Sequence, residues 1–204
     1  MPDGGAELAA DVTLALVGEH HVTNALAAAT IALESGIAVA DVAARLAGAG
    51  AASPHRMAVT ELPGGVTVID DSYNANPESM RAALKALVAL AAGGRRSIAV
   101  LGEMRELGED ALRQHDALGR LAVRLDVSRL VVVGDGARAM YTGALLEGSF
   151  GEEATFVSDI DEAQAWLREH GEPGDVVLLK SSHGSGLHLL ADRVLATRDL
   201  GAAR

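Results

Sequence analysis

Four short runs rich in valine, isoleucine and leucine constrain the fold of this chain more than any other feature. They are SIAVLG from Ser97, RLVVVG from Arg129, ATFVS from Ala154 and DVVLLK from Asp175. Their hydrophobicity is continuous instead of alternating, which indicates strands that are buried on both faces between layers of helices. We therefore predict an α/β domain with a Rossmann-like, doubly wound and mostly parallel sheet.

Amphipathic segments between and after these runs predict the helices of the two layers. They cover residues 77–91, 109–125, 137–146, 159–170 and 186–197. Upstream of them, two β-prone runs at residues 57–62 and 66–69 flank a Pro-Gly-Gly turn, which predicts an N-terminal β-hairpin. In such a sheet ligands bind at the carboxyl ends of the strands, so the loops that follow those ends are where we expect a site.

Two further helices are predicted ahead of the hairpin, at residues 18–36 and 39–46. The first has an apolar stripe of alanine and leucine and ends at Gly36, a residue suited to a C-terminal cap. Short helices without a packing partner are marginally stable in water. We therefore expect residues 1 to about 53 either to be mobile or to be buried against another copy of the chain, by self-association through the helices of residues 18–50.

The run GAGAASPH at residues 48–55 consists of small residues, contains Ser-Pro and is typical of a linker. The pattern of strands and helices begins only after it. We therefore divide the chain into residues 1–53, which contain two helices, and residues 54–204, which contain the α/β domain.

Composition excludes several classes of function. The net charge of −11 repels polyanions, and one Trp, two Tyr and two Phe offer few rings for stacking bases, so nucleic acid is not an expected partner. The chain has no cysteine, which excludes disulfides and thiolate metal sites. No run is apolar for the ~20 residues that a membrane span needs, so we expect no membrane insertion and a cytoplasmic location.

The segment VIDDSYNANPESM ends one predicted strand and opens the next helix. Asn76 suits the N-cap and Pro77 the first helical position, so both have a structural explanation. Asp71 has two explanations that stay open. Its carboxylate can accept hydrogen bonds from ribose hydroxyls at the strand end, or it can cap a turn.

The segment Lys180-Ser181-Ser182-His183 follows the last predicted strand and leads into the last helix. Small residues, hydroxyls and free backbone N–H groups at a helix N-terminus suit an anion, although such loops also serve as ordinary caps. Lys180 is one of only two lysines in the chain. We therefore take this loop as a second candidate site.

Two other interpretations stay open beside a phosphate site. The segment GDGARA from Gly134 matches the dinucleotide pattern G-x-G-x-x-A between a strand and a helix, which favours an NAD- or nucleotide-binding oxidoreductase, although the strand is not the first of its domain. A non-enzymatic α/β interaction module is the third interpretation. The phosphate-binding pattern G-x-x-x-x-G-K-[ST] does not occur in the sequence.

Taken in order, several segments resemble the Mur ligase family. GEHHVTN resembles the family's G-x-H-N-x-x-N helix start, SPHRM its linker arginine motif and DDSYNANPESM its aspartate loop, and LGEMRELG and LLKSSHGSGL resemble two later loops. The similarity spans about residues 18–195. The pattern D-x-Y-N-A-N-P-x-S-M, which residues 71–80 match, resembles the form of this loop in the branch of the family that adds D-alanyl-D-alanine. His21 departs from the family's usual Asn, and His183 stands where Arg or Asn is common.

The resemblance implies an ATP-dependent ligase of peptidoglycan precursor synthesis. Such an enzyme joins D-alanyl-D-alanine to UDP-N-acetylmuramoyl-tripeptide through an acyl phosphate and uses ATP and Mg²⁺. It also implies that residues 1–53 are a helical remnant of the family's central ATPase domain and that residues 54–204 are its C-terminal Rossmann-like domain.

The resemblance further implies roles for individual residues. Asn24 would contact the adenine, Arg56 the ATP phosphates and Asp71 the ribose or adjacent nucleotide groups. Tyr73, Asn74 and Asn76 would lie on the nucleotide side of the site. Arg56 and Lys180 would be the catalytic residues, and no metal ligand is implied in this chain. The residues facing the peptide and the incoming dipeptide would be Lys180, Ser181, Ser182 and His183.

We predict that this chain by itself has no ligase or ATPase activity. Its sequence lacks the lysine-containing loop that cradles the β- and γ-phosphates in such enzymes, and phosphoryl transfer depends on that positioning. Phosphate release would be measured on pure protein with ATP and both substrates. Release that depends on the substrates would contradict the prediction.

Overall fold

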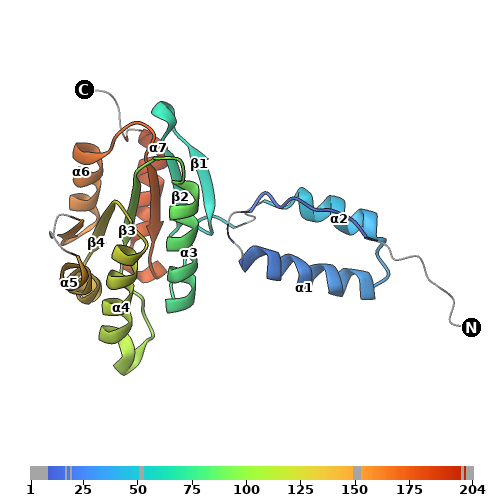
Figure 1. Ribbon diagram of the computed structural model, residues 1–204, viewed down its shortest axis with the longest axis horizontal. Coiled ribbons are helices and arrows are strands. Elements are labelled where there is room, and N and C mark those ends of the chain that lie inside the picture. The colour runs from blue at the N-terminus through green and yellow to red at the C-terminus, as the bar shows by residue number, and fades with distance from the viewer. Residues whose placement is uncertain are drawn as a thin grey trace, which may run out of the picture. The chain divides into compact units, whose positions relative to one another are not determined.

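The computed structural model describes residues 9–16, 18, 20–50, 53–148, 153–198 and 200. The chain divides into two compact units, Met1–Ala52 and Ser53–Arg204, and each is described by itself (Figure 1). The second unit contains every predicted strand and has its own core.

The second unit is built on a six-stranded sheet with the order β1-β2-β6-β3-β4-β5. All neighbouring strands are parallel except β1 and β2, which form the predicted antiparallel hairpin through a turn at Pro63–Gly65. The mostly parallel α/β sheet that the sequence predicts is therefore confirmed. The strands are β1 (Ala58–Glu61), β2 (Thr67–Asp71), β3 (Ser97–Leu101), β4 (Arg129–Val133), β5 (Ala154–Val157) and β6 (Val176–Lys180).

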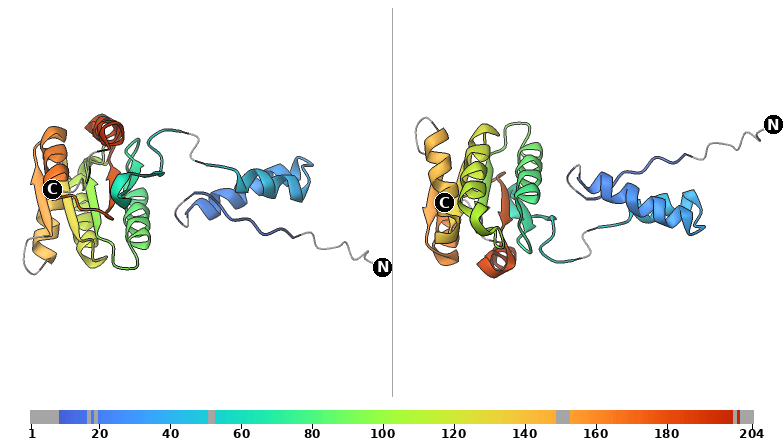
Figure 2. Two further views of the ribbon diagram at one scale, coloured as in Figure 1. Left: turned by 90° about the horizontal axis from the view of Figure 1, so that it is seen from above. Right: turned by 90° about the horizontal axis from the view of Figure 1, so that it is seen from below.

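Helices cover both faces of this sheet, as continuous hydrophobicity in the strands predicts (Figures 1 and 2). One layer consists of α3 (Pro77–Leu90), α4 (Ala111–Arg124) and α5 (Arg138–Glu147), and the other of α6 (Ile160–His170) and α7 (Leu187–Thr197). Every residue of β3 and β6 is buried. The core between the sheet and the second layer includes Val68, Val100, Val131, Val177, Leu179, Leu187 and Leu190.

The strand order determines which loops become neighbours. The last strand, β6, lies between β2 and β3, and its register pairs Lys180 with Asp71 on one side and with Leu101 on the other. The carboxyl ends of three parallel strands thus lie at one level. The aspartate loop and the loop after Lys180 meet there, although they are far apart in the sequence.

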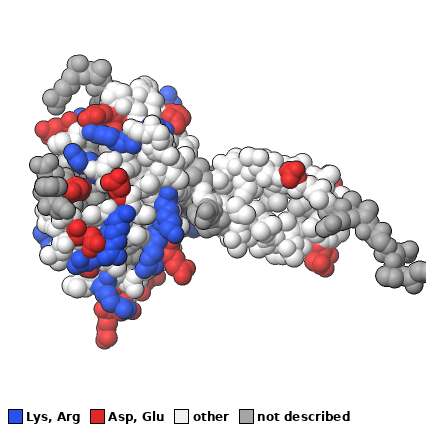
Figure 3. All heavy atoms as spheres, viewed as in Figure 1, with Lys and Arg blue, Asp and Glu red and all other residues white. Residues whose placement is uncertain are grey.

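The first unit consists of an extended segment at residues 9–16, α1 (His20–Glu34) and α2 (Val39–Ala47). It carries few charges in the face shown in Figure 3, whereas acidic and basic residues alternate over the second unit. Several large apolar side chains of α1 are exposed, Leu26 to 64% and Ile31 to 69%. None of the helices within the described residues has the length and hydropathy needed to cross a membrane.

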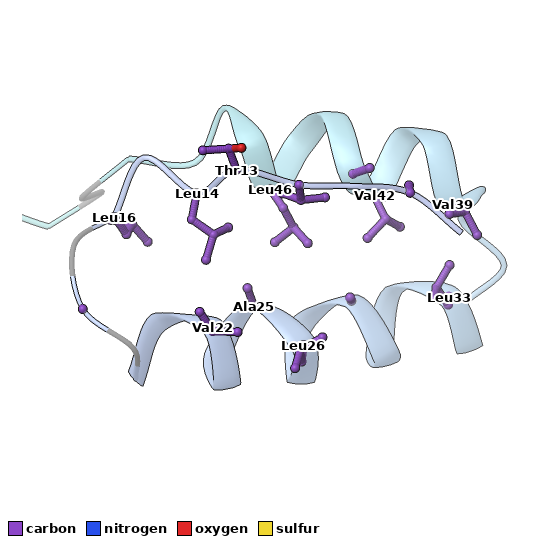
Figure 4. A pocket seen from close by; sticks show the side chains of 15 residues that line it. Thr13, Leu14, Leu16, Val22, Ala25, Leu26, Leu33, Val39, Val42 and Leu46 are labelled. Atoms are coloured by element: carbon purple, nitrogen blue, oxygen red, sulfur yellow. The ribbon is translucent and has the colours of Figure 1, made fainter. Parts of the chain in front are cut away.

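An apolar cavity of about 710 Å³ lies between the three elements of the first unit. Figure 4 shows leucine and valine side chains of the extended segment and α2 pointing towards α1. The unit buries little of this surface, since Val42 is the one residue of α2 that is fully buried. The two helices expected from the sequence therefore form, but they lack a core of their own.

Two glycines allow α4 and α5 to pack closely in the second unit. A Cβ at Gly119 would overlap the backbone carbonyl of Met140, and a Cβ at Gly143 would overlap that of Asp116. The two helices approach each other at these positions because neither residue has a side chain.

We expect Gly119→Ala to lower the free energy of unfolding by about 1–3 kcal/mol. The added methyl group meets rigid backbone, and overpacking of this kind outweighs the gain in helix propensity, which is at most ~1 kcal/mol. Urea unfolding measures the change. Gly136→Ala is the control, because the three atoms nearest to a Cβ there belong to the flexible side chain of Glu103. An equal loss in both variants would contradict the explanation.

Candidate functional site

A buried ion pair joins the aspartate loop to the end of β6. Lys180 Nζ donates to Asp71 Oδ2 at 2.5 Å and to the carbonyl of Asn74 at 2.8 Å. The side chain of Lys180 is only 2% exposed, and that of Asp71 is 14% exposed. The in-register pairing of β2 and β6 places the two residues side by side. Lys180 therefore holds the aspartate loop in place through the Asp71 carboxylate and the Asn74 carbonyl.

The charge of Lys180 depends on its surroundings. Burial is the largest influence and lowers the pKa of Lys180 below its ordinary value, the Asp71 carboxylate opposes this shift, and the charge of Arg56 lowers the pKa further. Burial disfavours an ammonium ion, whereas a carboxylate partner favours it.

Arg56 is exposed, and its neighbours in the chain and in space belong to the aspartate loop. Its Cζ lies 4.3 Å from the centroid of the Tyr73 ring, and the next residue, Met57, donates its backbone N–H to Asp71 Oδ1 at 3.1 Å. Within the described residues Arg56 forms no ion pair with a carboxylate. The structure thus brings together Arg56, Asp71, Tyr73 and Lys180, which the sequence analysis selected separately, and leaves one guanidinium group available to a ligand.

Three histidines extend the site. The His183 ring stacks on His188 at a centroid distance of 4.1 Å and lies 5.5 Å from Tyr73, while His55 meets His188 edge-on at 5.8 Å. Burial and the neighbouring histidines lower the pKa of His188. His183 is predicted from the sequence, whereas His55 and His188 are not, because no spacing relates residues whose rings meet only through the tertiary fold.

Several candidate polar groups already have structural partners. Asn76 caps α3 in a capping box with Ser79, with Pro77 at the first helical position, so this expectation is confirmed. Ser181 is fully buried and donates to the carbonyl of Ser182. The amide oxygen of Asn74 accepts from the N–H of the following residue. These side chains shape the loops, and His183 is the exposed member of the second candidate loop.

The loop at LGEMRELG packs against the loop after Lys180. Ser182 donates its N–H to the Glu103 carbonyl and accepts the N–H of Arg105, both at 2.9 Å. A side chain at Gly184 would collide with the Arg105 guanidinium group. Arg105 therefore lies beside the candidate site, and the sequence analysis gave it no role.

The glycine pattern that begins at Gly134 is less suited to a dinucleotide than its sequence suggests. It does lie between β4 and α5, as the pattern requires. However, the Glu103 carboxyl group lies directly against Gly136, where a Cβ would come within 2.5 Å of Glu103 Cδ. A pyrophosphate needs close approach to this glycine and would meet a negative charge, so the site disfavours the oxidoreductase interpretation.

The remaining candidate, Asn24, lies exposed on α1 in the first unit. No group of three or more His, Asp or Glu side chains in the described part of the chain is arranged to hold a metal ion. The candidate site of the second unit is thus a cluster of arginine, aspartate, lysine and aromatic residues at the carboxyl edge of the sheet.

This fold and this edge of the sheet define a class of protein. The family described as Mur ligase, glutamate ligase domain, matches residues 55–183. The match covers more than half of the 204 residues, and the chain therefore belongs to the Mur ligase family.

The more similar relatives share a particular activity in their names. The UDP-N-acetylmuramoyl-tripeptide–D-alanyl-D-alanine ligase of Mycobacterium leprae is 55% identical over 90% of this chain and 38% of its own length. The crystal structure of MurF from Acinetobacter baumannii has a TM-score of 0.80 and 32% identity, covering 91% of this chain and 40% of that one. MurF from Thermotoga maritima in complex with ADP has a TM-score of 0.70 and 26% identity over 92% and 40%. This chain spans about two fifths of these proteins.

We expect Lys180→Met to lower the free energy of unfolding by about 3 kcal/mol. Removing one partner of a buried pair leaves the other charge without compensation, at a cost of ~3–5 kcal/mol, and the partial exposure of Asp71 favours the lower end. Urea unfolding of both proteins gives the difference. A change in the free energy of unfolding below about 0.5 kcal/mol is typical of surface substitutions and would contradict a stabilising role of the buried pair.

Two controls identify the cause. The double variant Lys180→Met, Asp71→Asn should lose less stability than Lys180→Met, because it leaves no unpaired charge.

The pKa of Lys180 is lowered in the folded protein, so below the ordinary value of 10.5 the unfolded chain binds more protons. The free energy of unfolding should therefore gain from Lys180 as the pH rises through that window, and Lys180→Met should remove the gain.

Proposed function

We propose that this chain closes the nucleotide site of an ATP-dependent ligase that joins D-alanyl-D-alanine to UDP-N-acetylmuramoyl-tripeptide. The observation that carries the proposal is Arg56, an exposed arginine without a carboxylate partner among the described residues. It contacts the Tyr73 ring, and the backbone N–H of the next residue, Met57, donates to Asp71 of the buried pair. The names of the relatives support this choice of reaction. We propose a cytoplasmic location for this reaction, as expected from the sequence.

Arg56 is the residue that we assign to the ATP phosphates. An exposed guanidinium group matches the geometry and charge of phosphate oxygens, and its position on a unit separate from the first suits a group delivered when domains close. ATP supplies the phosphoryl group that activates the tripeptide carboxylate, with Mg²⁺ as its counter-ion. Arg56 would stabilise the charge that develops during that transfer.

The other nucleotide contacts follow from what remains accessible. Asp71 uses both carboxylate oxygens within the protein, yet each oxygen retains a lone pair that can accept a ribose hydroxyl. Tyr73 presents its ring beside Arg56, and Asn74 and Asn76 lie exposed in the same loop. We assign the adenine contact to Asn24 of the first unit.

On the substrate side we assign the direct contact to His183. Its side chain is exposed, whereas Lys180, Ser181 and Ser182 are buried. In this proposal Lys180 supports catalysis through the aspartate loop, and the two serines maintain the shape of the loop that faces the tripeptide and the dipeptide.

We propose that residues 1–53 belong to the central ATPase domain of such an enzyme and that residues 54–204 form its C-terminal domain. The apolar cavity and the exposed leucines of the first unit support this assignment, because a surface of this kind is normally covered. The remainder of an ATPase domain would cover it. In isolated protein, a second copy of the chain would serve instead.

A hybrid enzyme tests the proposed function. We expect a protein in which this chain replaces the matching part of the Mycobacterium leprae ligase to release phosphate only with both substrates present. In that hybrid Arg56→Ala should lower kcat by on the order of 10²-fold, and it should raise the KM for ATP much less, because the arginine stabilises charge that forms in the transition state.

Arg113→Ala is the matched control, because the Arg113 side chain is 73% exposed on α4 and, among the described residues, pairs only with Asp110. It should leave kcat unchanged. A hybrid that folds but releases no phosphate would count against the proposed reaction. A raised KM with unchanged kcat in Arg56→Ala would instead make Arg56 a ground-state contact.

A further inference from the structure

The backbone around Arg56 adopts a conformation that must be held by other contacts. His55 has a φ of 59° and Met57 a φ of 48°, so a left-handed residue lies on each side of Arg56. This region is unfavourable for residues other than glycine and persists where surrounding contacts hold it. The contacts of these two neighbours therefore determine where Arg56 points.

The Met57 side is held by burial and by one carboxylate. Met57 is 6% exposed, and its N–H donates to Asp71 Oδ1. These contacts place the C-terminal side of Arg56 against the pair that Asp71 forms with Lys180.

The His55 side is held by the other carboxylate of the loop. His55 Nδ1 lies 2.7 Å from Asp70 Oδ2, and the His55 carbonyl accepts the N–H of Tyr73 at 3.1 Å. Asp70 is 3% exposed, and its second oxygen accepts both the hydroxyl and the N–H of Ser72. A buried carboxylate that is fixed in this way gives the imidazole ring one orientation.

The surroundings of His55 add further restraint. His188 lies edge-on to its ring, and the Asp192 carboxylate is 3.9 Å from its Nε2. The Arg56 side chain itself has one such contact among the described residues: its guanidinium group lies over the face of the Tyr73 ring. The direction of the Arg56 side chain is thus set by the backbone conformation. On the N-terminal side of Arg56, that conformation depends on the contacts of His55.

We propose that His55 and Asp70 form a positioning pair that directs Arg56 onto the face of Tyr73. In this proposal His55 acts through Arg56, so it is a positioning residue. The pair presents the guanidinium group in one place before any ligand binds, which reduces the entropy lost on binding. What Arg56 binds rests on the proposed function, whereas its placement does not.

Two substitutions of His55, by residues that have nearly the same shape as each other, test the positioning pair. In His55→Asn the amide nitrogen is bonded to Cγ, as Nδ1 is, so it can still donate to Asp70. His55→Asp has the same shape and the same tolerance of a left-handed backbone, but it cannot donate when ionised and it repels Asp70. His55→Gly also lacks the donor and relieves the backbone, and it serves if His55→Asp fails to fold.

The measurement is the NMR signal of the Arg56 Nε–H group in the whole chain. A guanidinium group above a ring is shifted upfield by the ring current, so wild type should show this shift. We expect His55→Asn to keep it, and His55→Asp and His55→Gly to lose most of it. Arg138, whose Cζ lies 3.9 Å from the Phe156 ring centroid, is the internal reference and should keep its shift in every variant that is folded.

Each outcome decides the proposal. The positioning pair would be overturned by an Arg56 signal that stays upfield in folded His55→Asp or folded His55→Gly, that lacks the shift in wild type, or that loses it in His55→Asn. Titration with inorganic tripolyphosphate then tests the proposed function separately. If the wild-type Arg56 signal keeps its ring-current shift but does not respond to tripolyphosphate, the phosphate role of Arg56 fails while the positioning pair stands.

Discussion

The buried pair of Lys180 and Asp71 is the interaction on which the candidate site depends. An ammonium group with 2% exposure is tolerated only with a charged partner and further acceptors, and Asp71 and the carbonyl of Asn74 supply them. The pair connects the last strand of the domain to the first parallel one. The aspartate loop therefore keeps its shape only while β6 stays paired with β2.

Because Asp71 has two oxygens, one carboxylate performs two tasks. It neutralises Lys180 with one oxygen and orders the N–H of Met57 with the other. Arg56, next to Met57, has no carboxylate partner within the described ranges. The site therefore combines a buried positive charge, which is compensated, with an exposed one, which is available to an anion. An exposed and uncompensated guanidinium group suits contact with phosphate oxygens. In a protein with a net charge of −11, it offers an anion a local positive charge.

The two units differ in how much of their apolar surface they bury. Ser53–Arg204 has a sheet covered on both faces, and its central strands are fully buried. Met1–Ala52 has two helices and an extended segment around an apolar cavity, with large side chains exposed on α1. The second unit therefore has a core of its own, whereas the first leaves much of its apolar surface uncovered.

The amino-acid sequence alone determined the order and type of the elements and the edge of the sheet where the site lies. Continuous apolar runs, amphipathic helices and the cap at Asn76 are local signals, and local physics is sufficient to interpret them. Tertiary structure decided the rest. It buried Lys180 and Ser181, and it brought His55 against Asp70 and His188 against His183. Such pairs arise because β6 lies between β2 and β3, and no sequence spacing records contacts that depend on strand order and register.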